Sequence, residues 1–277
     1  MKPIITSQEL KVLIDQSGVV IIDSSYPSGR ETFLKGHIQN ALFVDLDTDL
    51  ADIQSDFKNG GRHPLPSLAK FSELLGHLGI TSQSHVVVYD RNNGAFASRF
   101  WWMMRSIGHV KVQVLDGGFD QTLEAGIPTE SGFGNNIEPS EYEASEWKWK
   151  VSDMKDVENA LVLDTRNVFD VRGEARYKGE VEPIDLIAGH IPGALNAPFA
   201  NNLTDEGIFK SAEELKSQFE ALLNGVDSGN SIFHCGSGVT ACHSILAVDI
   251  AGMAIPSLYV GSWSEWSRNE KPVANHE

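Results

Sequence analysis

The chain carries one set of ordered landmarks twice, and this duplication limits its possible folds more than any other feature. Each set contains an apolar run ending in Asp, a Gly-His-Ile segment, a second apolar run, and a third apolar run followed by a glycine turn. The paired segments are 19–23 with 160–164, 36–42 with 189–195, 85–90 with 231–235, and 114–119 with 258–263. Self-similarity over such distances is typical of a duplicated domain rather than of a short-period solenoid.

Both copies alternate short apolar runs with helical patterns, such as those of residues 67–78 and 211–223. This alternation predicts an α/β fold in which helices flank a parallel sheet. The polar, glycine-containing stretch 130–146 has the composition of a linker. We therefore predict two tandem α/β domains, residues 1–139 and 140–277, each long enough to bury its own core.

Composition limits the partners of the chain. Its net charge of −16 disfavours nucleic acids and anionic membranes, which bind clustered Lys and Arg. No apolar run approaches the roughly 20 residues of a membrane span. Residues 1–7 lack the apolar region and the cleavage site of a signal peptide. We therefore expect a cytoplasmic protein without nucleic-acid or membrane partners, in which both cysteines stay reduced.

Cys235 is the strongest candidate for chemistry. It follows the apolar run 231–234 and enters a Gly-Ser-Gly turn, through Gly236 and Gly238, that leads to a helix starting at Thr240. A thiol at such a junction faces backbone N–H groups and the positive end of a helix dipole, which favour thiolate over thiol. The glycines allow residues 236–240 to curl into an anion-binding cradle for a substrate or a persulfide.

Two other interpretations of this segment fit its residues less well. An inert buried cysteine before an ordinary turn is disfavoured by the strand, loop and helix order. A cysteine phosphatase needs an arginine six positions after the nucleophile, where this chain has Ala241. Cys242 lies two turns into the same helix, so we expect a small buried hydrophobic residue there rather than a second redox thiol or a disulfide partner.

The loop from Cys235 through Gly236, Ser237, Gly238 and Val239 to Thr240 resembles the active-site loop of the rhodanese superfamily, in the form carried by 3-mercaptopyruvate sulfurtransferases. Thiosulfate sulfurtransferases of that superfamily usually have Arg-Lys after the cysteine, so a monoanionic donor fits this loop better. The resemblance extends over almost the whole chain. It implies two tandem rhodanese-like domains, of which the first is inactive, and here the first copy has Asp90 where the second has Cys235.

The resemblance also implies a proton relay. The family places an aspartate and a histidine of the first domain beside the serine of the loop, and the matching positions are Asp47, His63 and Ser237. An imidazole oriented by a carboxylate is a suitable proton shuttle near neutral pH. His37 and His190 occupy repeat-equivalent positions, so we interpret both as structural residues of a turn.

Recognition of the carboxylate of a 2-oxo acid donor calls for arginine, because a guanidinium pairs with two oxygens at once. The resemblance implies two such arginines. By resemblance, Arg176 in Arg-Tyr-Lys-Gly is the first of them. The second normally follows a Glu-Pro pair, but Ile184 and Asp185 follow Glu182-Pro183 here. Segment 167–175 looks longer than in the family, so Arg172 or Arg166 is a candidate substitute. Trp263, Trp266 and Ser262 match the family's C-terminal motif, and we assign them to the core or an interface.

Together with the resemblance, these residues predict a sulfurtransferase that moves sulfane sulfur from 3-mercaptopyruvate to cyanide or a thiol acceptor through a persulfide on Cys235. The resemblance makes thioredoxin an example of that acceptor. The absence of clustered Cys and His argues against a metal site, and the chemistry needs no organic cofactor. Two alternatives stay open at this point. Thiosulfate is the donor in the first, and in the second the chain is a non-catalytic persulfide carrier.

Overall fold

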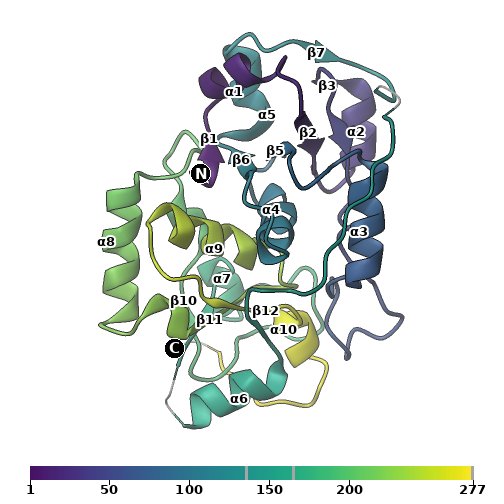
Figure 1. The fold of residues 1–277 in the computed structure, drawn as a ribbon. Helices are drawn as coiled ribbons and strands as arrows, with labels where there is room; N and C mark the ends of the chain where they lie inside the picture. The colour runs from purple at the N-terminus through teal and green to yellow at the C-terminus, as the bar shows by residue number, and fades with distance from the viewer. Residues whose placement is uncertain (135–136, 164–165, 276–277) are drawn as a thin grey trace. The chain divides into compact units, whose positions relative to one another are not determined.

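The computed structural model describes residues 1–134, 137–163 and 166–275 of the chain. It divides into two compact units, and each unit includes a short segment from the other part of the sequence (Figure 1). The first unit contains residues 1–52, 66–148 and 206–208, and the second contains residues 53–65, 149–205 and 209–277. The division between the units therefore falls after Lys148, later than the expected boundary at residue 139, and segment 53–65 belongs with the second unit.

The first unit is an α/β unit built on a five-stranded parallel sheet of order β1-β6-β5-β2-β4. Its strands are β1 Ile4–Ile5, β2 Val19–Asp23, β3 His37–Ile38, β4 Leu42–Phe43, β5 His85–Tyr89, β6 Val112–Leu115 and β7 Thr129–Glu130. Its helices are α1 Ser7–Leu13, α2 Gly29–Lys35, α3 Leu68–His77, α4 Ala97–Ser106 and α5 Gly118–Glu124. Strands β3 and β7 form a separate antiparallel pair.

The second unit repeats this architecture with the sheet order β8-β12-β11-β9-β10, again all parallel. Its strands are β8 Val151–Ser152, β9 Asn167–Asp170, β10 Leu195–Asn196, β11 Ser231–His234 and β12 Ser257–Tyr259. Its helices are α6 Met154–Val162, α7 Glu174–Tyr177, α8 Ala212–Leu223, α9 Thr240–Ile250 and α10 Ser262–Trp266, with short 3₁₀ turns at Phe199–Asn202 and Ser228–Asn230. Helices α8 and α9 pack together, as do α6 and α10, so helices cover the sheet on both faces (Figure 1).

The two expected helices are confirmed and begin at side-chain caps. Ser67 accepts a hydrogen bond from the N–H of Lys70 ahead of α3, and Ser211 forms a reciprocal capping box with Glu214 ahead of α8. These bonds satisfy N–H groups that the first turn of a helix otherwise leaves without partners. The prediction of parallel sheets flanked by helices is therefore confirmed in both units.

One predicted strand is wrong. In the segment 160–164 that we paired with 19–23, residues 160–162 end α6 and Leu163 is its C-cap, while Asp164 lies outside the described residues. The counterpart of β2 is β9. Asp153 and Asp156 form a capping box that starts α6, and the apolar residues after it continue the helix. Asp170 therefore corresponds to Asp23. Segment 167–175 is consequently not an insertion, because its first four residues are the strand itself.

The repeated histidines are structural, as predicted. His37 Nδ1 bonds to the carbonyl of Phe33 and its ring stacks on the Phe33 ring at 3.6 Å. His190 Nδ1 bonds to the carbonyl of Tyr177 and its ring stacks on the Tyr177 ring at 3.7 Å. Each pair ties the end of a short helix to the chain that follows it. The two units therefore share the same local structure at these repeated histidines.

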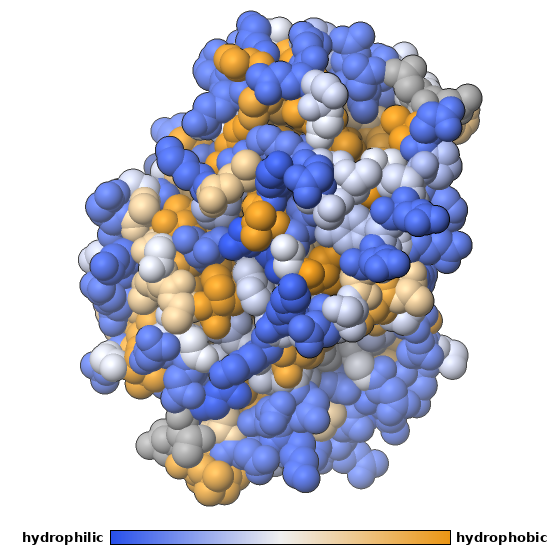
Figure 2. All heavy atoms as spheres, in the orientation of Figure 1, coloured by the Kyte–Doolittle hydropathy of each residue, from blue (hydrophilic) through white to orange (hydrophobic). Residues whose placement is uncertain are grey.

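The drawn face of the molecule is largely hydrophilic, with hydrophobic residues in small separate groups (Figure 2). Among the described residues, no helix has both the length and the apolar character needed to cross a bilayer. Trp263 and Trp266 are buried in the core of the second unit together with Tyr259 and Ile232. Their assignment to packing is confirmed.

Candidate active site

Cys235 lies directly after β11, the central strand of the second unit, and just before α9. Ligands of parallel α/β sheets bind beyond the carboxyl ends of the strands, which is where this thiol lies. Its N–H donates to Oγ of Ser262 at 3.1 Å, and its carbonyl accepts from the N–H of Trp263 at 3.0 Å. The start of α10 therefore fixes the backbone on which the buried thiol is carried.

Gly238 is needed for the loop to curl after Cys235. Its φ is +70°, in the left-handed region that favours glycine, and a Cβ built there would lie 2.6 Å from the carbonyl oxygen of Val260. The carbonyl of Gly236 accepts a hydrogen bond from the N–H of Ser264 at 2.8 Å. A larger residue at position 238 would push the loop away from the chain that supports it.

In the matching loop of the first unit, backbone N–H groups bind a carboxylate. Asp90 takes the place of the cysteine, and its carboxylate accepts four backbone N–H bonds of 2.7–2.9 Å. The donors are Asn92, Gly94, Phe96 and Ala97. Burial raises the pKa of Asp90, and these four bonds oppose the rise. In the first unit, the aspartate thus fills its own anion-binding loop.

Ser237 and His63 meet beside the thiol. Nδ1 of His63 and Oγ of Ser237 are joined by a hydrogen bond of 2.7 Å between largely buried side chains. The contact is possible because segment 53–65 packs within the second unit, although it lies far away in sequence. Two of the three residues expected to form the relay are therefore in contact.

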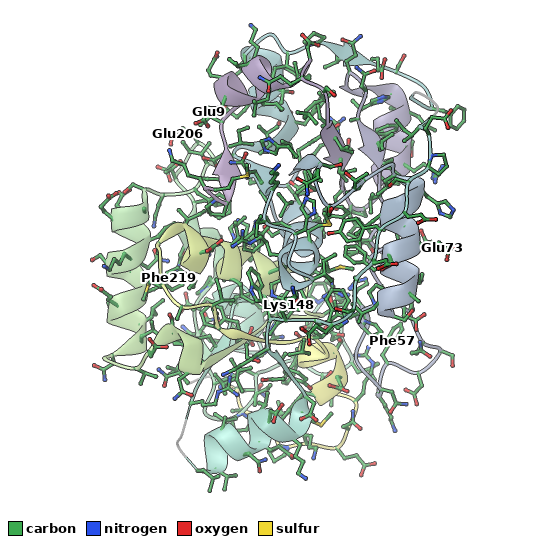
Figure 3. All side chains as sticks on the ribbon, viewed as in Figure 1. Glu9, Phe57, Glu73, Lys148, Glu206 and Phe219 are labelled. Carbon is green, nitrogen blue, oxygen red and sulfur yellow. The ribbon has the colours of Figure 1, made fainter. Side chains whose placement is uncertain are left out.

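Segment 53–65 is anchored on α10 and its entry turn. The N–H of Gly60 donates to Glu265 at 2.8 Å, and the N–H of Arg62 donates to Oγ of Ser264 at 3.0 Å. Gly61 has a φ of +76° and leaves no room for a Cβ against the backbone of Gly261. After the end of α10, the guanidinium of Arg268 lies over the ring of Phe57, which is labelled in Figure 3. These contacts set the position of His63.

Asp47, the third residue of the predicted relay, belongs to the first unit. Its N–H donates to Oδ1 of Asp45 at 2.9 Å, within a turn that follows β4. The participation of Asp47 in the relay stays a prediction.

Arg176, on α7, lies beside Gly236 in the loop after Cys235. Its guanidinium pairs with Glu182 at 2.7 Å and with Asp185 at 3.5 Å, and 21% of its side chain is exposed. A Cβ built on Gly236 would lie 3.6 Å from both of its terminal nitrogens. This position suits the expected role of Arg176 as a ligand for a substrate anion.

Arg172 is held differently, since its side chain is almost fully buried. It pairs with Asp170 at 2.6 Å and with Glu182 at 3.2 Å, and donates to the carbonyl of Gly189 at 2.7 Å. Burial lowers the pKa of Arg172, but Asp170, Glu182 and the Cys235 thiolate outweigh it and raise that pKa. The geometry gives Arg172 a positive charge near the thiol and commits most of its donors to the protein. Arg166 donates to the carbonyl of Ser231.

The site contains residues that sequence reasoning missed. Ser262 holds the N–H of Cys235 from a left-handed conformation, with a φ of +54°. Arg62 directly precedes His63, and its side chain lies beside Gly236, where Asp185 accepts its hydrogen bonds. The double glycine before Arg62 was the available signal, because it indicates a close approach of backbones.

Other features of the site concern the second thiol and metals. Cys242 is buried in α9, where its Sγ donates to the carbonyl of Gly238 at 3.4 Å, and neither cysteine forms a disulfide. Within the described ranges, no group of three or more His, Cys, Asp or Glu residues is arranged to hold a metal ion.

Comparison with known proteins identifies the family. The model of the rhodanese-like domain matches twice, at residues 6–125 and 151–269. A probable 3-mercaptopyruvate sulfurtransferase of Pseudomonas aeruginosa is 37% identical over 98% of this chain and 97% of its own length. Thiosulfate sulfurtransferase of Bos taurus is 36% identical over 92% of this chain and 87% of its own.

Solved structures agree with this result. The crystal structure of SseA from Escherichia coli, described as a 3-mercaptopyruvate sulfotransferase, has a TM-score of 0.81 and 33% identity, covering 96% of this chain and all of its own. The 3-mercaptopyruvate sulfurtransferase of Leishmania major has a TM-score of 0.83 and 29% identity, covering 96% of this chain and 74% of its own. The chain therefore belongs to the rhodanese-like family, with two such domains in tandem.

Proposed function

We propose that the protein is a sulfurtransferase that takes sulfur from 3-mercaptopyruvate and passes it, through a persulfide on Cys235, to a thiol acceptor such as thioredoxin. The observation that carries this proposal is the hydrogen-bonded pair Ser237 and His63 beside the only thiol in a Gly-X-Gly loop. Relatives of similar identity are named for two donors, mercaptopyruvate and thiosulfate. The loop of this chain favours the former, because Gly236 and Ser237 add no positive charge after the nucleophile.

The donor step moves one sulfur atom. The Cys235 thiolate attacks the thiol sulfur of the donor, the new sulfur–sulfur bond forms, and the bond between that sulfur and C3 breaks. Its electron pair goes to C3 and gives the enolate of pyruvate, which takes up one proton. We assign to the hydroxyl of Ser237, which is hydrogen-bonded to His63, the donation of a hydrogen bond to the developing enolate oxygen.

The cradle and its charges stabilise the anionic sulfur. Four N–H groups converge on the carboxylate of Asp90 in the first unit, and by duplication the loop after Cys235 offers amides to a persulfide. Preorganised N–H groups of this kind are effective because they need no reorientation during the reaction. Buried Arg172 adds a positive charge nearby. We assign catalysis to the second domain, in a reducing cytoplasmic setting that keeps the thiol free.

A comparison of donors tests the proposed function. We expect kcat/KM for 3-mercaptopyruvate to exceed that for thiosulfate by about 100-fold or more, with cyanide or reduced thioredoxin as acceptor, because the loop lacks the cationic pair suited to a dianion. Both donors are measured side by side on the same preparation. Preference for thiosulfate would establish the alternative donor. A stable persulfide with no more than one pyruvate released per chain, even with acceptor present, would instead identify a carrier.

Replacing His63 tests the relay. His63→Gln is expected to slow pyruvate release in a single turnover by about 100-fold, the usual contribution of a positioned acid or base. Ser237→Ala should have a similar effect, and the double variant should lose little more, because residues acting as a unit are not additive. Rapid-quench measurement of pyruvate provides the rates. Additive losses would show that Ser237 and His63 act separately.

A further inference from the structure

The loop after Glu182-Pro183 lacks the expected arginine and carries Asp185 instead. Asp185 stands in this loop with a fully buried carboxylate, and three arginines surround it. Arg62 lies 3.2 Å away, Arg268 2.8 Å and Arg176 3.5 Å. Glu182 also pairs with Arg176, so three arginines face two carboxylates and leave one net positive charge at the loop, in a chain whose overall charge is −16.

Two of these arginines converge on the Cys235 loop. A Cβ built on Gly236 would lie 2.9 Å from Nη2 of Arg62 and 3.6 Å from the terminal nitrogens of Arg176. Arg62 also donates to both oxygens of Asp185, through Nε and Nη2. The aspartate therefore fixes the guanidinium in place, next to the residue that follows the nucleophile.

Both guanidinium groups keep capacity for a ligand. The hydrogen bonds of Arg62 and Arg176 to protein groups use Nε and Nη2, so Nη1 of each remains available within the described part of the chain. The side chains are 17% and 21% exposed, which makes them accessible to solute. A guanidinium that is held by a buried carboxylate and still presents N–H groups outward is well suited to bind a carboxylate.

We propose that Arg62 is the second carboxylate-binding residue of this enzyme, acting with Arg176 on the 2-oxo acid donor. Asp185 is a positioning residue that holds Arg62 over the loop, and glycine at position 236 leaves the space that the guanidinium occupies. Arg62, in segment 53–65, thus takes the role that an arginine after Glu182-Pro183 normally has in the family. This inference rests on the proposed function only for the identity of the donor, because it concerns anion recognition beside Cys235.

Alkylation of Cys235 tests this inference without sulfur transfer. Iodoacetate carries a carboxylate and iodoacetamide is its neutral analogue, so the ratio of their rate constants reports carboxylate attraction at the thiol. In Arg62→Gln this ratio should fall about tenfold, while the iodoacetamide rate shows that the loop is intact. Arg62→Lys keeps the charge and should recover part of the ratio. Alkylation of Cys235→Ser is subtracted as background from Cys242.

Arg268→Gln is the matched control, because it removes a positive charge from the same carboxylate without touching Gly236. We expect its ratio to stay within about threefold of wild type. Gly236→Ala provides an independent variant, since its Cβ intrudes on Nη2 of Arg62. It should lower the ratio as Arg62→Gln does. Equal losses in the Arg62 and Arg268 variants would overturn the proposal, because charge around Asp185 rather than contact at Gly236 would then be responsible.

Steady-state kinetics separate this inference from the proposed function. In Arg62→Gln, KM for 3-mercaptopyruvate should rise about 10- to 100-fold with a smaller change in kcat. An unchanged KM and an unchanged alkylation ratio, in an enzyme that turns over mercaptopyruvate, would reject Arg62 and leave the function intact. A reduced ratio in a protein that does not use mercaptopyruvate would support the carboxylate site and reject the donor.

Discussion

Cys235→Ser is expected to abolish sulfur transfer, lowering kcat by about 10³-fold or more with either donor. A serine hydroxyl at this position is close in size to the thiol, but it forms no persulfide and is not ionised near neutral pH. Mass spectrometry of the protein after incubation with donor alone should show one added sulfur atom in wild type and none in the variant. Turnover is followed in parallel as release of pyruvate.

Cys242→Ser is the control for this experiment. Cys242 lies in α9 and is as buried as Cys235, and its Sγ donates to the carbonyl of Gly238, a bond that serine can also make. The control should keep activity within about twofold of wild type. Wild-type turnover in Cys235→Ser, or loss of the persulfide in Cys242→Ser, would contradict the assignment of the nucleophile.

Asp170→Asn is expected to destabilise the second unit by about 3–5 kcal/mol, the usual cost of removing one partner of a buried ion pair. Asp170 accepts three hydrogen bonds from the guanidinium of Arg172 at 2.6–3.0 Å, and both side chains are buried. The variant leaves Arg172 with Glu182 and one carbonyl for its remaining charge. Urea unfolding followed by the accessibility of the Cys235 thiol reports this unit specifically.

The duplication provides a matched control for this variant. Asp23 is the counterpart of Asp170 and accepts from the N–H of Ser25, just as Asp170 accepts from that of Arg172, but among the residues that the structure describes no arginine pairs with it. Asp23→Asn should cost about 1 kcal/mol, the scale of one hydrogen bond. Equal costs at the two positions would show that the ion pair adds nothing to the backbone turn.

The pH dependence of the same variant has a defined sign. Burial raises the pKa of Asp170, but Arg172 and His234 outweigh it and hold that pKa below its usual range. A depressed native pKa stabilises the fold above the unfolded value of about 3.9, and the contribution is lost as pH falls through the native pKa. The difference in free energy of unfolding between wild type and Asp170→Asn should therefore shrink below about pH 4.

Most of the fold was predictable from the repeated landmarks, and the main error has a local cause. Residues 160–163 are as apolar as a buried strand, and a short apolar run does not distinguish a strand from the end of a helix. The capping box of Asp153 and Asp156 made the difference, since it starts a helix that runs through these residues. The helix-capping residues before this segment thus outweighed its strand-like composition.

The sequence by itself determined the duplication and the parallel α/β architecture, and it singled out the residue that we propose as the nucleophile. These features depend on contacts that are local or repeated along the chain, such as strand runs, helix caps and the glycine turn after Cys235. The position of Ser237 follows from the same local geometry, because it lies on the loop that the strand delivers. Arg176 was expected from the family resemblance, and its approach to Gly236 is a tertiary contact.

Only the tertiary structure decided which distant residues complete the site. Segment 53–65 packs against α10 through Gly61 and Glu265, and so brings His63 to Ser237 and Arg62 to Gly236. No periodicity encodes such a contact, because it depends on hydrogen bonds between groups that are far apart in sequence. Arg172 illustrates the opposite case, since burial beside Asp170 committed to the protein most of the donors that the sequence offered to a substrate.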